Sequence, residues 1–376
     1  MRRLAVVGNP DNRRVTLFTA AVVRAGLPPP DVYAWRDVLA GGRVPGPTAP
    51  DVYAWRDVLA CGSVPGPGVS VRIDSPGEDA EVDRLLRELG SGRPARPAEH
   101  GEIVGSAAAF AGLRHALDRI TAGGGDLLNQ PGDVLTMTDK RRCHAVLSAA
   151  GIPVPPALGP VHDYESLRAA MRDTGWSRVF VKPAYGSSAS GVLALAVSAR
   201  RIAATTSVEL HDGRLFNSLR VRRYDDEATI AAIVDRLGPD GLHVERWYSK
   251  AGLGGRTLDL RVVVIGGRAR HVVVRAGQSP MTNLHLGNAR GDVAAVRAAA
   301  GEQAWQAAMD TCERVAGCFG RTLHVGVDLM FRSGWRDHAV AEVNAFGDLL
   351  PGVLADGLDT YGAQVAALTG GWVPSA

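Results

Sequence analysis

Apolar positions in the first ninety residues alternate between short runs and helical spacing. Leu4 to Gly8 is a short apolar run that ends in glycine, which predicts a first β-strand, and apolar residues at helical spacing follow from Val15 to Gly26. Val69 to Ile73 alternates apolar and polar residues, which predicts another strand, and an amphipathic helix then runs to Gly90. This alternation of strands and helices predicts an α/β domain in the first third of the chain.

One segment of this region occurs twice. DVYAWRDVLA stands at residues 31–40 and again at 51–60, and the ten residues after each copy share G-x-V-P-G-P. No third copy follows, whereas a solenoid needs about three repeats to bury a continuous core. We interpret the repeat as a local tandem duplication within residues 31–70. We expect one copy in the sheet beside Leu4–Gly8 and the other as a surface excursion, and two adjacent strands of identical sequence are the alternative.

The chain after residue 90 begins with a Pro/Gly-rich linker and continues with a different pattern. Beyond residue 180, strands dominate and only a few helices stand between them, which predicts α+β structure with mainly antiparallel sheets. A loop is expected between residues 121 and 133. The expected helices are 103–120, 138–151 with Thr138 as N-cap, 164–174, 226–237, 292–315 and a last one ending near Leu368. The expected strands include 178–183, a series up to Arg275, and two on either side of Trp335.

Composition and charge exclude several classes of partner. A chain of 376 residues is long enough for two or three domains, and its 46% hydrophobic and 22% charged residues are those of a globular protein. The net charge of +3 gives no argument for a nucleic-acid surface, and the basic residues are dispersed apart from 140–142 and 220–223. No apolar run approaches the ~20 residues of a membrane span, and the N-terminal apolar run is too short for a signal peptide.

The cysteines favour a reducing compartment. Cys61, Cys143, Cys312 and Cys318 form no C-x-x-C and have no regular spacing, so neither a disulfide framework nor a zinc site is expected. Cys143 and His144 are adjacent, but neighbouring helix residues point about 100° apart, which favours a buried cysteine beside a surface histidine. We therefore expect a cytoplasmic location.

The stretch FVKPAYGSSASGVLAL, Phe180 to Leu195, has residues suited to binding an anion. A strand delivers Lys182, a Gly/Ser-rich loop follows, and a second strand runs back. Glycine lets backbone N–H groups approach an anion closely, serine adds hydroxyl donors, and the lysine adds a positive charge. The order differs from a P-loop because the lysine precedes the loop and no helix follows. A hairpin with a surface lysine is the alternative.

A second stretch, GVDLMFRSGWRDHAVAEVNAFGDLLPG, combines apolar alternation with oxygen ligands. Two strands around a Gly-Trp turn carry Asp328 on one and Glu342 and Asn344 on the other. Glu342 and Asn344 are two residues apart, so both project from one face of the sheet. Hard oxygen ligands on one face suit Mg²⁺, which binds through one or two carboxylates together with substrate phosphates. A paired surface Asp and Glu is the alternative, but the apolar neighbours make unpaired carboxylates costly there.

Together these segments resemble the ATP-grasp superfamily, most nearly its glutathione-synthetase and ribosomal-protein glutamate-ligase branch. The resemblance covers residues 139–352 and rests on six motifs in the family's order. They are TDKRRCHAVLSAAGIPVPP, the K-P-x-x-G-S-S-x-x-G of residues 182–191, VERWY, LDLRVVVIGGRARHVVVR, TNLHLGNA, and VDL followed by EVNAFGD. It implies an α/β N-terminal domain followed by an α+β ATP-grasp core of two subdomains with antiparallel sheets. The implied boundaries are 1–128, 129–245 and 246–376.

The resemblance also implies roles for individual residues. The implied cofactors are ATP and Mg²⁺, with Asp328, Glu342 and Asn344 as metal ligands. Arg261 and Arg275 would face the γ-phosphate and the developing acyl phosphate, and a simple ion pair is the alternative for Arg275. The side chain of Glu245 and the backbone of Arg246 and Trp247 would bind adenine. The implied nucleotide-binding set is Lys140, Lys182, Gly186, Ser187, Ser188, Gly191, Glu245, Arg246 and Trp247.

Two features depart from the family's pattern or stand outside it. The family's small Ser-Pro-Gly after E-V-N is here Ala345-Phe346-Gly347-Asp348, which changes the wall of the acceptor site, so the resemblance names no particular substrate. The turn Ser75–Asp79 stands at a predicted strand end and could face the substrate cleft, as ligands of open α/β sheets do. An ordinary turn and helix N-cap is the alternative for it.

The function implied is an ATP-dependent carboxylate–amine ligase. The enzyme would form an acyl phosphate and release ADP and phosphate, with small-molecule or peptide carboxylates and amines as substrates and no nucleic-acid or membrane partner. An ATP-grasp phosphotransferase and a non-catalytic nucleotide-binding protein are the alternatives. The presence of Lys140, Lys182 and all three metal ligands argues against the second alternative. The sequence gives no oligomeric state.

Overall fold

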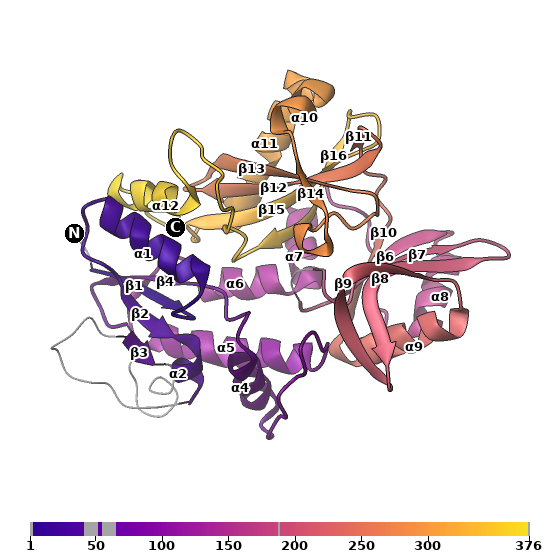
Figure 1. The fold of residues 1–376 in the computed structure, drawn as a ribbon, viewed down its shortest axis with the longest axis horizontal. Helices are drawn as coiled ribbons and strands as arrows, with labels where there is room; N and C mark the ends of the chain where they lie inside the picture. The colour runs from indigo at the N-terminus through magenta and orange to yellow at the C-terminus, as the bar shows by residue number, and fades with distance from the viewer. Residues whose placement is uncertain (1–2, 41–51, 55–64, 187–188, 375–376) are drawn as a thin grey trace.

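The computed structural model describes residues 3–40, 52–54, 65–186 and 189–374 of the chain. These residues form three sheets, one parallel and two antiparallel, with helices packed against them (Figure 1). The arrangement confirms the predicted order of an α/β N-terminal part followed by two antiparallel sheets. None of the helices in these ranges is both long and apolar enough to cross a bilayer.

The N-terminal sheet is parallel, with the strand order β3-β2-β1-β4-β5. Its helices α4 and α5 pack closely where Gly90 and Gly112 meet. Only glycine fits at this contact, since a Cβ on Gly90 would lie 1.9 Å from the Ala108 carbonyl oxygen. The helix predicted to end at Gly90 continues one residue further, to Ser91. The elements are β1 (Arg3–Gly8), α1 (Arg13–Arg24), β2 (Asp31–Ala34), α2 (Trp35–Ala40), β3 (Val52–Ala54), β4 (Val69–Ile73), α4 (Ala80–Ser91), α5 (Ser106–Ala122) and β5 (Asp126–Leu127).

The two copies of DVYAWRDVLA both contribute strands, so our expectation of a single copy in the sheet is wrong. β2 comes from the first copy and β3 from the second, and they pair in parallel with identical residues opposite each other, Val32 with Val52 and Tyr33 with Tyr53. The alternative of two adjacent identical strands therefore holds. β3 adds an edge to the sheet, and the segment after it, residues 55–64, lies outside the described residues.

Two helices connect the N-terminal sheet to the rest of the molecule, and both correct the predicted boundaries. The expected loop between residues 121 and 133 contains β5 and the start of α6 (Pro131–Thr138). Thr138 ends α6, and Asp139 is the N-cap of α7 (Lys140–Ala149) because its carboxylate accepts hydrogen bonds from the N–H groups of Arg141 and Arg142. This cap places Lys140 at the first position of α7.

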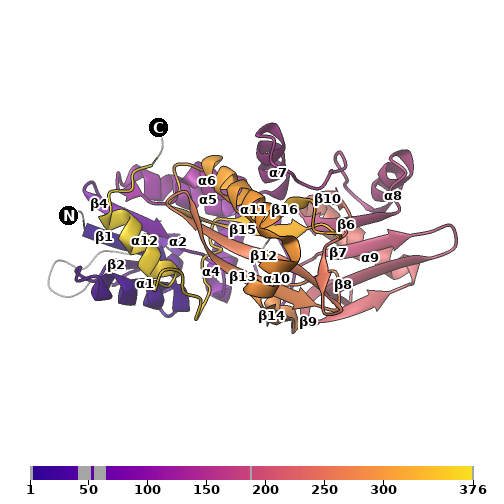
Figure 2. The same cartoon turned by 90° about the horizontal axis from the view of Figure 1, so that it is seen from above.

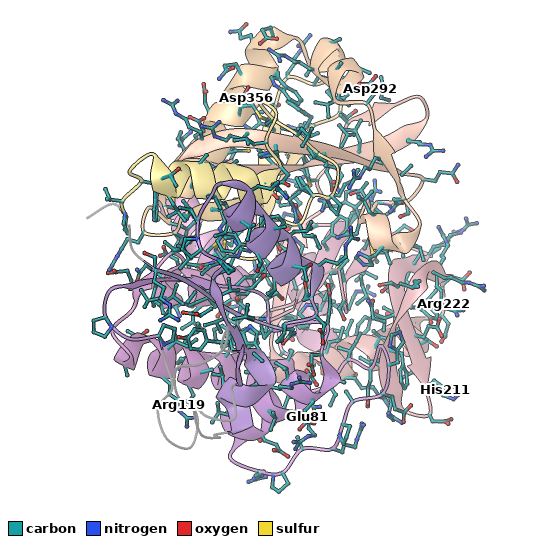
Figure 3. All side chains as sticks on the ribbon, turned by 60° about the vertical axis from the view of Figure 1, so that its left-hand side comes forward. Glu81, Arg119, His211, Arg222, Asp292 and Asp356 are labelled. Carbon is teal, nitrogen blue, oxygen red and sulfur yellow. The ribbon has the colours of Figure 1, made fainter. Side chains whose placement is uncertain are left out.

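The central sheet is antiparallel, with the order β10-β6-β7-β8-β9. Its buried core joins the sheet to α8 and α9 through residues such as Leu167, Val181 and Ile233. At its outer edge, Figure 3 shows Arg222 and His211 on the surface, and Arg222 is ion-paired with Glu209. The elements are α8 (Tyr164–Asp173), β6 (Arg178–Pro183), β7 (Leu193–Val197), β8 (Ile202–His211), β9 (Arg214–Tyr224), α9 (Glu227–Leu237), η1 (Gly238–Asp240) and β10 (Leu242–Arg246).

The C-terminal sheet is also antiparallel, with the order β14-β13-β12-β15-β16. The single helix expected over residues 292–315 is two helices, because Gly301 breaks it with a φ of 79°. The last helix, α12, returns to lie beside α1 of the N-terminal part (Figures 1 and 2). The elements are β11 (Gly252–Leu253), β12 (Arg256–Ile265), β13 (Arg268–Gly277), η2 (Leu284–Leu286), β14 (Ala289–Gly291), α10 (Val293–Ala300), α11 (Glu302–Gly317), β15 (His324–Phe331), β16 (His338–Asn344) and α12 (Thr360–Thr369).

Three of the four cysteines fall among the described residues, and none of these three forms a disulfide. Cys143 is buried, as expected. His144 is half-buried rather than on the surface, and its Nε2 lies 2.8 Å from the Pro155 carbonyl oxygen. The pair therefore points apart, with each side chain packed on a different neighbour.

Candidate functional site

A cavity of about 730 Å³ lies between the central and C-terminal sheets, and charged residues from both sheets and from α7 line it. Apolar side chains form another part of its wall, including Phe180, Met281 and Met330. A larger hollow of about 1300 Å³, beside α10 and α11, contains none of the predicted site residues. The charged residues of the first cavity are the cations Lys140, Lys182, Arg246, Lys250 and Arg275 and the carboxylates Glu245, Asp259, Asp328 and Glu342.

Lys182 and Glu245 form a buried ion pair across neighbouring strands β6 and β10. Lys182 Nζ lies 2.6 Å from Glu245 Oε2, and His243 Nε2 lies 2.8 Å from Glu245 Oε1. Burial alone would raise the pKa of Glu245, but Lys182 and His243 outweigh it and hold the pKa at about 2. Glu245 is therefore ionised and fixes the lysine at the cavity wall. Its carboxylate, which we expected to bind adenine, is bonded to these two partners.

The backbone after Glu245 differs from the expected adenine contact. The N–H of Arg246 donates to the Pro156 carbonyl at 2.8 Å, and the N–H of Trp247 donates to the Arg178 carbonyl at 3.0 Å. Both N–H groups already have acceptors, so this segment would bind adenine through its carbonyl oxygens, which accept hydrogen bonds. Arg246 lines the cavity, whereas the Trp247 ring packs on Phe180, with centroids 5.0 Å apart.

Lys140 connects the glycine-rich loop to the C-terminal sheet. Its Nζ donates to the Gly186 carbonyl at 2.6 Å and lies 3.1 Å from Glu342 Oε1. Gly186 lines the cavity, and Gly191 closes the loop with a φ of 74°, where a Cβ would lie 2.5 Å from Pro183 Cγ. Glycine is therefore required at the end of the loop. Ser187 and Ser188, which we expected to contact phosphate, lie outside the described residues.

Asp259, Lys250 and Arg275 form a second charged group in the cavity. Asp259 Oδ1 accepts a hydrogen bond from Arg275 Nε at 2.7 Å, and its Oδ2 accepts one from Lys250 Nζ at the same distance. Thr282 donates a further hydrogen bond to Oδ2. Burial alone would raise the pKa of Asp259, but Arg275 and Lys250 outweigh it and bring the pKa well below its ordinary value. A permanently charged aspartate therefore orients two cations at the cavity wall.

Arg275 has the ion pairs that we gave as its alternative, but they lie within the cavity. Its guanidinium bridges two carboxylates, since Nη2 also lies 3.1 Å from Asp328 Oδ2. Arg261 lies on β12, where it is the strand partner of Asp328 on β15. It donates to both oxygens of the Asp328 carboxylate and, through Nη1, to the Gly347 carbonyl at 3.2 Å. Burial would raise the pKa of Asp328, but Arg261 and Arg275 lower it overall. Both arginines thus face Asp328.

The three predicted metal ligands lie on two neighbouring strands. Asp328 on β15 is the direct partner of Glu342 on β16, and Gly326 is the partner of Asn344. The amide nitrogen of Asn344 points to the Gly326 carbonyl at 3.5 Å, which leaves its amide oxygen as the atom available to a cation. Within the described ranges, no group of three or more His, Cys, Asp or Glu forms a metal site.

The donors nevertheless fit Mg²⁺ bound together with phosphates. Mg²⁺ takes few protein ligands, commonly one or two carboxylates, and completes its shell with phosphate oxygens and water. Two carboxylates directly opposite each other in a sheet repel, and a cation between them removes that repulsion. In the structure, Lys140 and the two arginines neutralise them. Asp328, Glu342 and Asn344 would hold the ion.

Several residues of the cavity were missed from the sequence. Lys250 lies in a loop after β10 and meets Asp259 of β12 only in the folded chain, so no sequence pattern indicated it. Asn283 belongs to the motif TNLHLGNA and Met281 directly precedes it, and neither residue was predicted as part of the site. Asp259 stood in the D-x-R pattern beside Arg261 and could have been selected with it.

The turn Ser75–Asp79 is held by the loop after β1 and by its own helix. Asn9 Nδ2 donates to the Gly77 carbonyl at 2.9 Å, and Asn12 Nδ2 donates to Glu78 Oε2 at 2.8 Å. Asp79 is the N-cap of α4. These contacts agree with the ordinary turn and N-cap, and none of the turn's residues lines the cavity described above.

Solved structures show which fold this arrangement belongs to. A scan against protein-family models gives no match, and a search of curated proteins gives none either. The ATP-grasp ligase PsnB complexed with minimal precursor matches over 98% of this chain and 99% of its own, at 17% identity and a TM-score of 0.52. The chain has the ATP-grasp fold.

Two other ATP-grasp structures match over a similar length. The D-cycloserine synthetase DcsG is 16% identical over 97% of this chain and 99% of its own, with a TM-score of 0.55. The macrocyclase MdnC bound with precursor peptide MdnA, from Microcystis aeruginosa MRC, is 12% identical over 98% and 99%, with a TM-score of 0.53. At these identities the likeness shows the ATP-grasp fold alone.

Proposed function

We propose that this ATP-grasp protein is an ATP-dependent carboxylate–amine ligase that works through an acyl phosphate and releases ADP and inorganic phosphate. One observation carries the proposal. Lysines from α7 and β6, an arginine from β13 and carboxylates from β15 and β16 converge on one cavity between two antiparallel sheets. Phosphoryl transfer needs this combination of positioning and charge neutralisation, and little covalent chemistry from the protein.

The cationic residues would bind and orient the phosphates of ATP. Lys182 is fixed by Glu245, and Lys140 is bonded to the carbonyl of Gly186, so both ammonium groups are positioned before a ligand enters. Gly186 and Gly191 bound a loop whose backbone can approach phosphate closely. The adenine would lie against the apolar side chains of Phe180, Met281 and Met330, which share the same cavity.

The reaction would then proceed in two displacements. A carboxylate oxygen of the substrate attacks the γ-phosphorus, and ADP leaves with the electrons of the broken P–O bond. An amine nitrogen next attacks the acyl carbon, the C–O bond to phosphate breaks, and phosphate departs while the amine loses a proton. Arg275 and Arg261 would stabilise the charge on the transferred group, with Asp259 and Asp328 holding their guanidinium groups in place.

Asp328, Glu342 and Asn344 would hold Mg²⁺, which supplies charge neutralisation at the transferred phosphate. The residues that follow Asn344 concern the choice of acid and amine substrates. Phe346 stands where the family has small residues and is half-buried against the apolar core, so we propose no particular acid or amine. PsnB was solved with a minimal precursor and MdnC with a precursor peptide, which supports testing peptides as well as small acids.

Hydroxylamine as a generic amine gives the most direct screen for this activity. Purified protein, MgATP and pools of carboxylic acids, including peptides, are incubated with hydroxylamine, and ADP and hydroxamates are measured. The proposal predicts ADP and a hydroxamate in equal amounts for at least one pool. ADP with a phosphorylated product and no hydroxamate would identify a phosphotransferase. No ADP from any pool would favour a non-catalytic nucleotide-binding protein.

Two variants make the screen specific to this cavity. Lys182→Ala removes a cation of the site and should abolish the hydroxamate signal. Arg96→Ala is the control, because Arg96 pairs with Glu102 on the surface and lies outside the cavity. Equal signals from the two variants would show that a contaminating enzyme, rather than this site, made the product.

A further inference from the structure

The turn that follows Asn344 ends in a fully buried carboxylate. Asp348 is 0% exposed, and its two oxygens accept hydrogen bonds from three side chains. Arg72 Nη2 donates at 2.8 Å and Gln364 Nε2 at 2.9 Å to Oδ2, and Arg14 Nη1 donates at 3.1 Å to Oδ1. Burial alone would raise the pKa of Asp348, but Arg72, together with the other cations, lowers it well below its ordinary value.

The central cation of this cluster is locked from several sides. Arg72, on β4 of the N-terminal sheet, is 1% exposed. Its guanidinium contacts two aromatic rings that meet edge to face, with its central carbon 5.1 Å from the centroid of Phe18 and 5.3 Å from that of Tyr361. It also donates to the amide oxygen of Gln364. A planar cation that contacts two rings and is hydrogen-bonded at its edges has little freedom, so it holds Asp348 in one place.

Three arginines from different elements hold the same turn, two through its backbone carbonyls and one through the side chain of Asp348. Arg14, in the first turn of α1, donates to the Phe346 carbonyl at 2.7 Å as well as to Asp348. Arg261 on β12 donates to the Gly347 carbonyl. Arg72 completes the set through Asp348. The N-terminal part thus supplies two of the three cations that fix residues 345–348.

Close packing also limits where the turn can lie. Gly347 crosses Gly326 of β15 so closely that a Cβ on Gly347 would lie 2.8 Å from the Cα of Gly326. Gly326 is itself the strand partner of Asn344. The turn is therefore pressed against β15 on one side and held by arginines on the other. A shift of the turn would move Asn344 and the end of β16 with it.

Buried ion clusters are weak evidence for stability, because desolvation offsets much of the attraction, but they can specify one geometry. We infer that Arg14, Arg72 and Asp348 act as positioning residues, which set the cation site of Glu342 and Asn344 from the N-terminal part of the chain. None of the three lines the cavity. The inference rests on the proposed function, since it assigns a purpose to the geometry of the proposed metal ligands.

Arg14→Met tests this inference through cation binding rather than turnover. Mn²⁺ is titrated into protein with ADP, and free Mn²⁺ is followed by its electron paramagnetic resonance signal. We expect binding weakened by about 10-fold, the lower end of the effect of losing a residue that orients metal ligands. The thermal midpoint should also fall, because Asp348 loses a partner.

Arg87→Met is the matched control. Arg87 is 5% exposed, lies in the same N-terminal part, and is bonded to Asp83 and to the Arg96 carbonyl, far along the chain from the turn. Its loss should lower the thermal midpoint and leave Mn²⁺ binding unchanged. Unchanged Mn²⁺ binding in Arg14→Met, despite a lower thermal midpoint, would show that the cluster is only structural and would overturn the inference.

Arg14→Lys keeps the test decisive if Arg14→Met does not fold. Lysine retains the charge, but its ammonium ends one bond short of Nη1, through which Arg14 makes both the Phe346 and the Asp348 contacts, so binding should be intermediate. Wild-type affinity in Arg14→Lys would contradict the inference. Absence of Mn²⁺ binding by the wild-type protein would instead contradict the cation site itself, and the inference would fall with it.

Discussion

Asp328 and Glu342 are directly opposed on β15 and β16, and each carboxylate is neutralised by cations from other elements. Arg261 and Arg275 bind Asp328, whereas Lys140 binds Glu342. The Asp328 side chain is 5% exposed and that of Glu342 is 24% exposed, so the same change of charge has different consequences at the two positions. Substitutions at the two positions can therefore separate an effect on turnover from an effect on the free energy of unfolding.

Glu342→Gln should reduce turnover without unfolding the protein. Glu342 is partly exposed and Lys140 keeps its bond to the Gly186 carbonyl, so the free energy of unfolding should change little. We expect turnover to fall by ~10²-fold or more, as when one preorganised charge stabiliser is lost. Steady-state ADP release and a denaturant titration measure the two effects. ADP release close to wild type would remove Glu342 from the site.

Asp328→Asn should damage both properties. The substitution leaves Arg261 and Arg275 buried beside a neutral group, and breaking a buried pair costs about 3–5 kcal/mol of stability. The same denaturant titration should therefore show a clear loss for Asp328→Asn and almost none for Glu342→Gln. Equal stability of the two variants would contradict the pairing that the structure gives.

Lys182→Ala should lose stability in a pH-dependent way, besides losing turnover. The pKa of Glu245 is about 2 in the folded protein against an ordinary value of 4.5. A carboxyl with a depressed pKa stabilises the fold above its ordinary value, and that contribution disappears as the pH falls toward the folded pKa. The variant should thus be less stable than wild type at pH 7, and the difference should shrink as the pH falls from 4.5 toward 2.

Free energies of unfolding at several pH values measure this effect. Arg172→Ala serves as the control, because Arg172 is an exposed cation in the last turn of α8 and, within the described residues, forms no ion pair with a carboxylate. A difference between Lys182→Ala and wild type that is constant from pH 7 to the acid limit would show that Glu245 does not depend on Lys182.

Local patterns in the sequence predicted the elements well, and residues that meet across the fold were harder to predict. Asp328 and Glu342 stand in neighbouring predicted strands, and the resemblance to the ATP-grasp superfamily implied that Lys182 joins them in one site. Lys250 and Asp348 could not be selected in this way. Their partners, Asp259 and Arg72, come from other strands, and only the folded sheets bring these charges together.

The repeated segment shows the same limit. The pattern of DVYAWRDVLA allowed a strand in either copy, and we expected only one copy in the sheet. Whether a second identical strand has a neighbour depends on the open edge of the sheet. β2 offers that edge, and β3 pairs with it in register. The segment after Glu245 is a further example, since the motif includes Arg246 while the acceptor of its backbone N–H, Pro156, lies elsewhere in the chain.

Deletion of residues 41–60 restores a single copy and should leave ATP turnover nearly unchanged. It removes β3, a three-residue strand at the edge of the N-terminal sheet, away from the cavity (Figure 1). We expect a modest drop in the thermal midpoint. Trp35→Ala is the contrast, because Trp35 is 0% exposed and its loss should cost about 3–5 kcal/mol. Failure of the deletion to fold would show that the second copy is structurally required.

Transfer of oxygen from the carboxylate to phosphate distinguishes an acyl-phosphate ligase from the alternative functions. An acid identified by the hydroxylamine screen is labelled with ¹⁸O in its carboxylate and incubated with MgATP, the amine and the protein, and the phosphate released is analysed by mass spectrometry. Formation and aminolysis of an acyl phosphate transfer one ¹⁸O from each carboxylate to phosphate, in step with ADP. Release of ADP with unlabelled phosphate, or with the phosphoryl group retained on the product, would contradict the ligase mechanism.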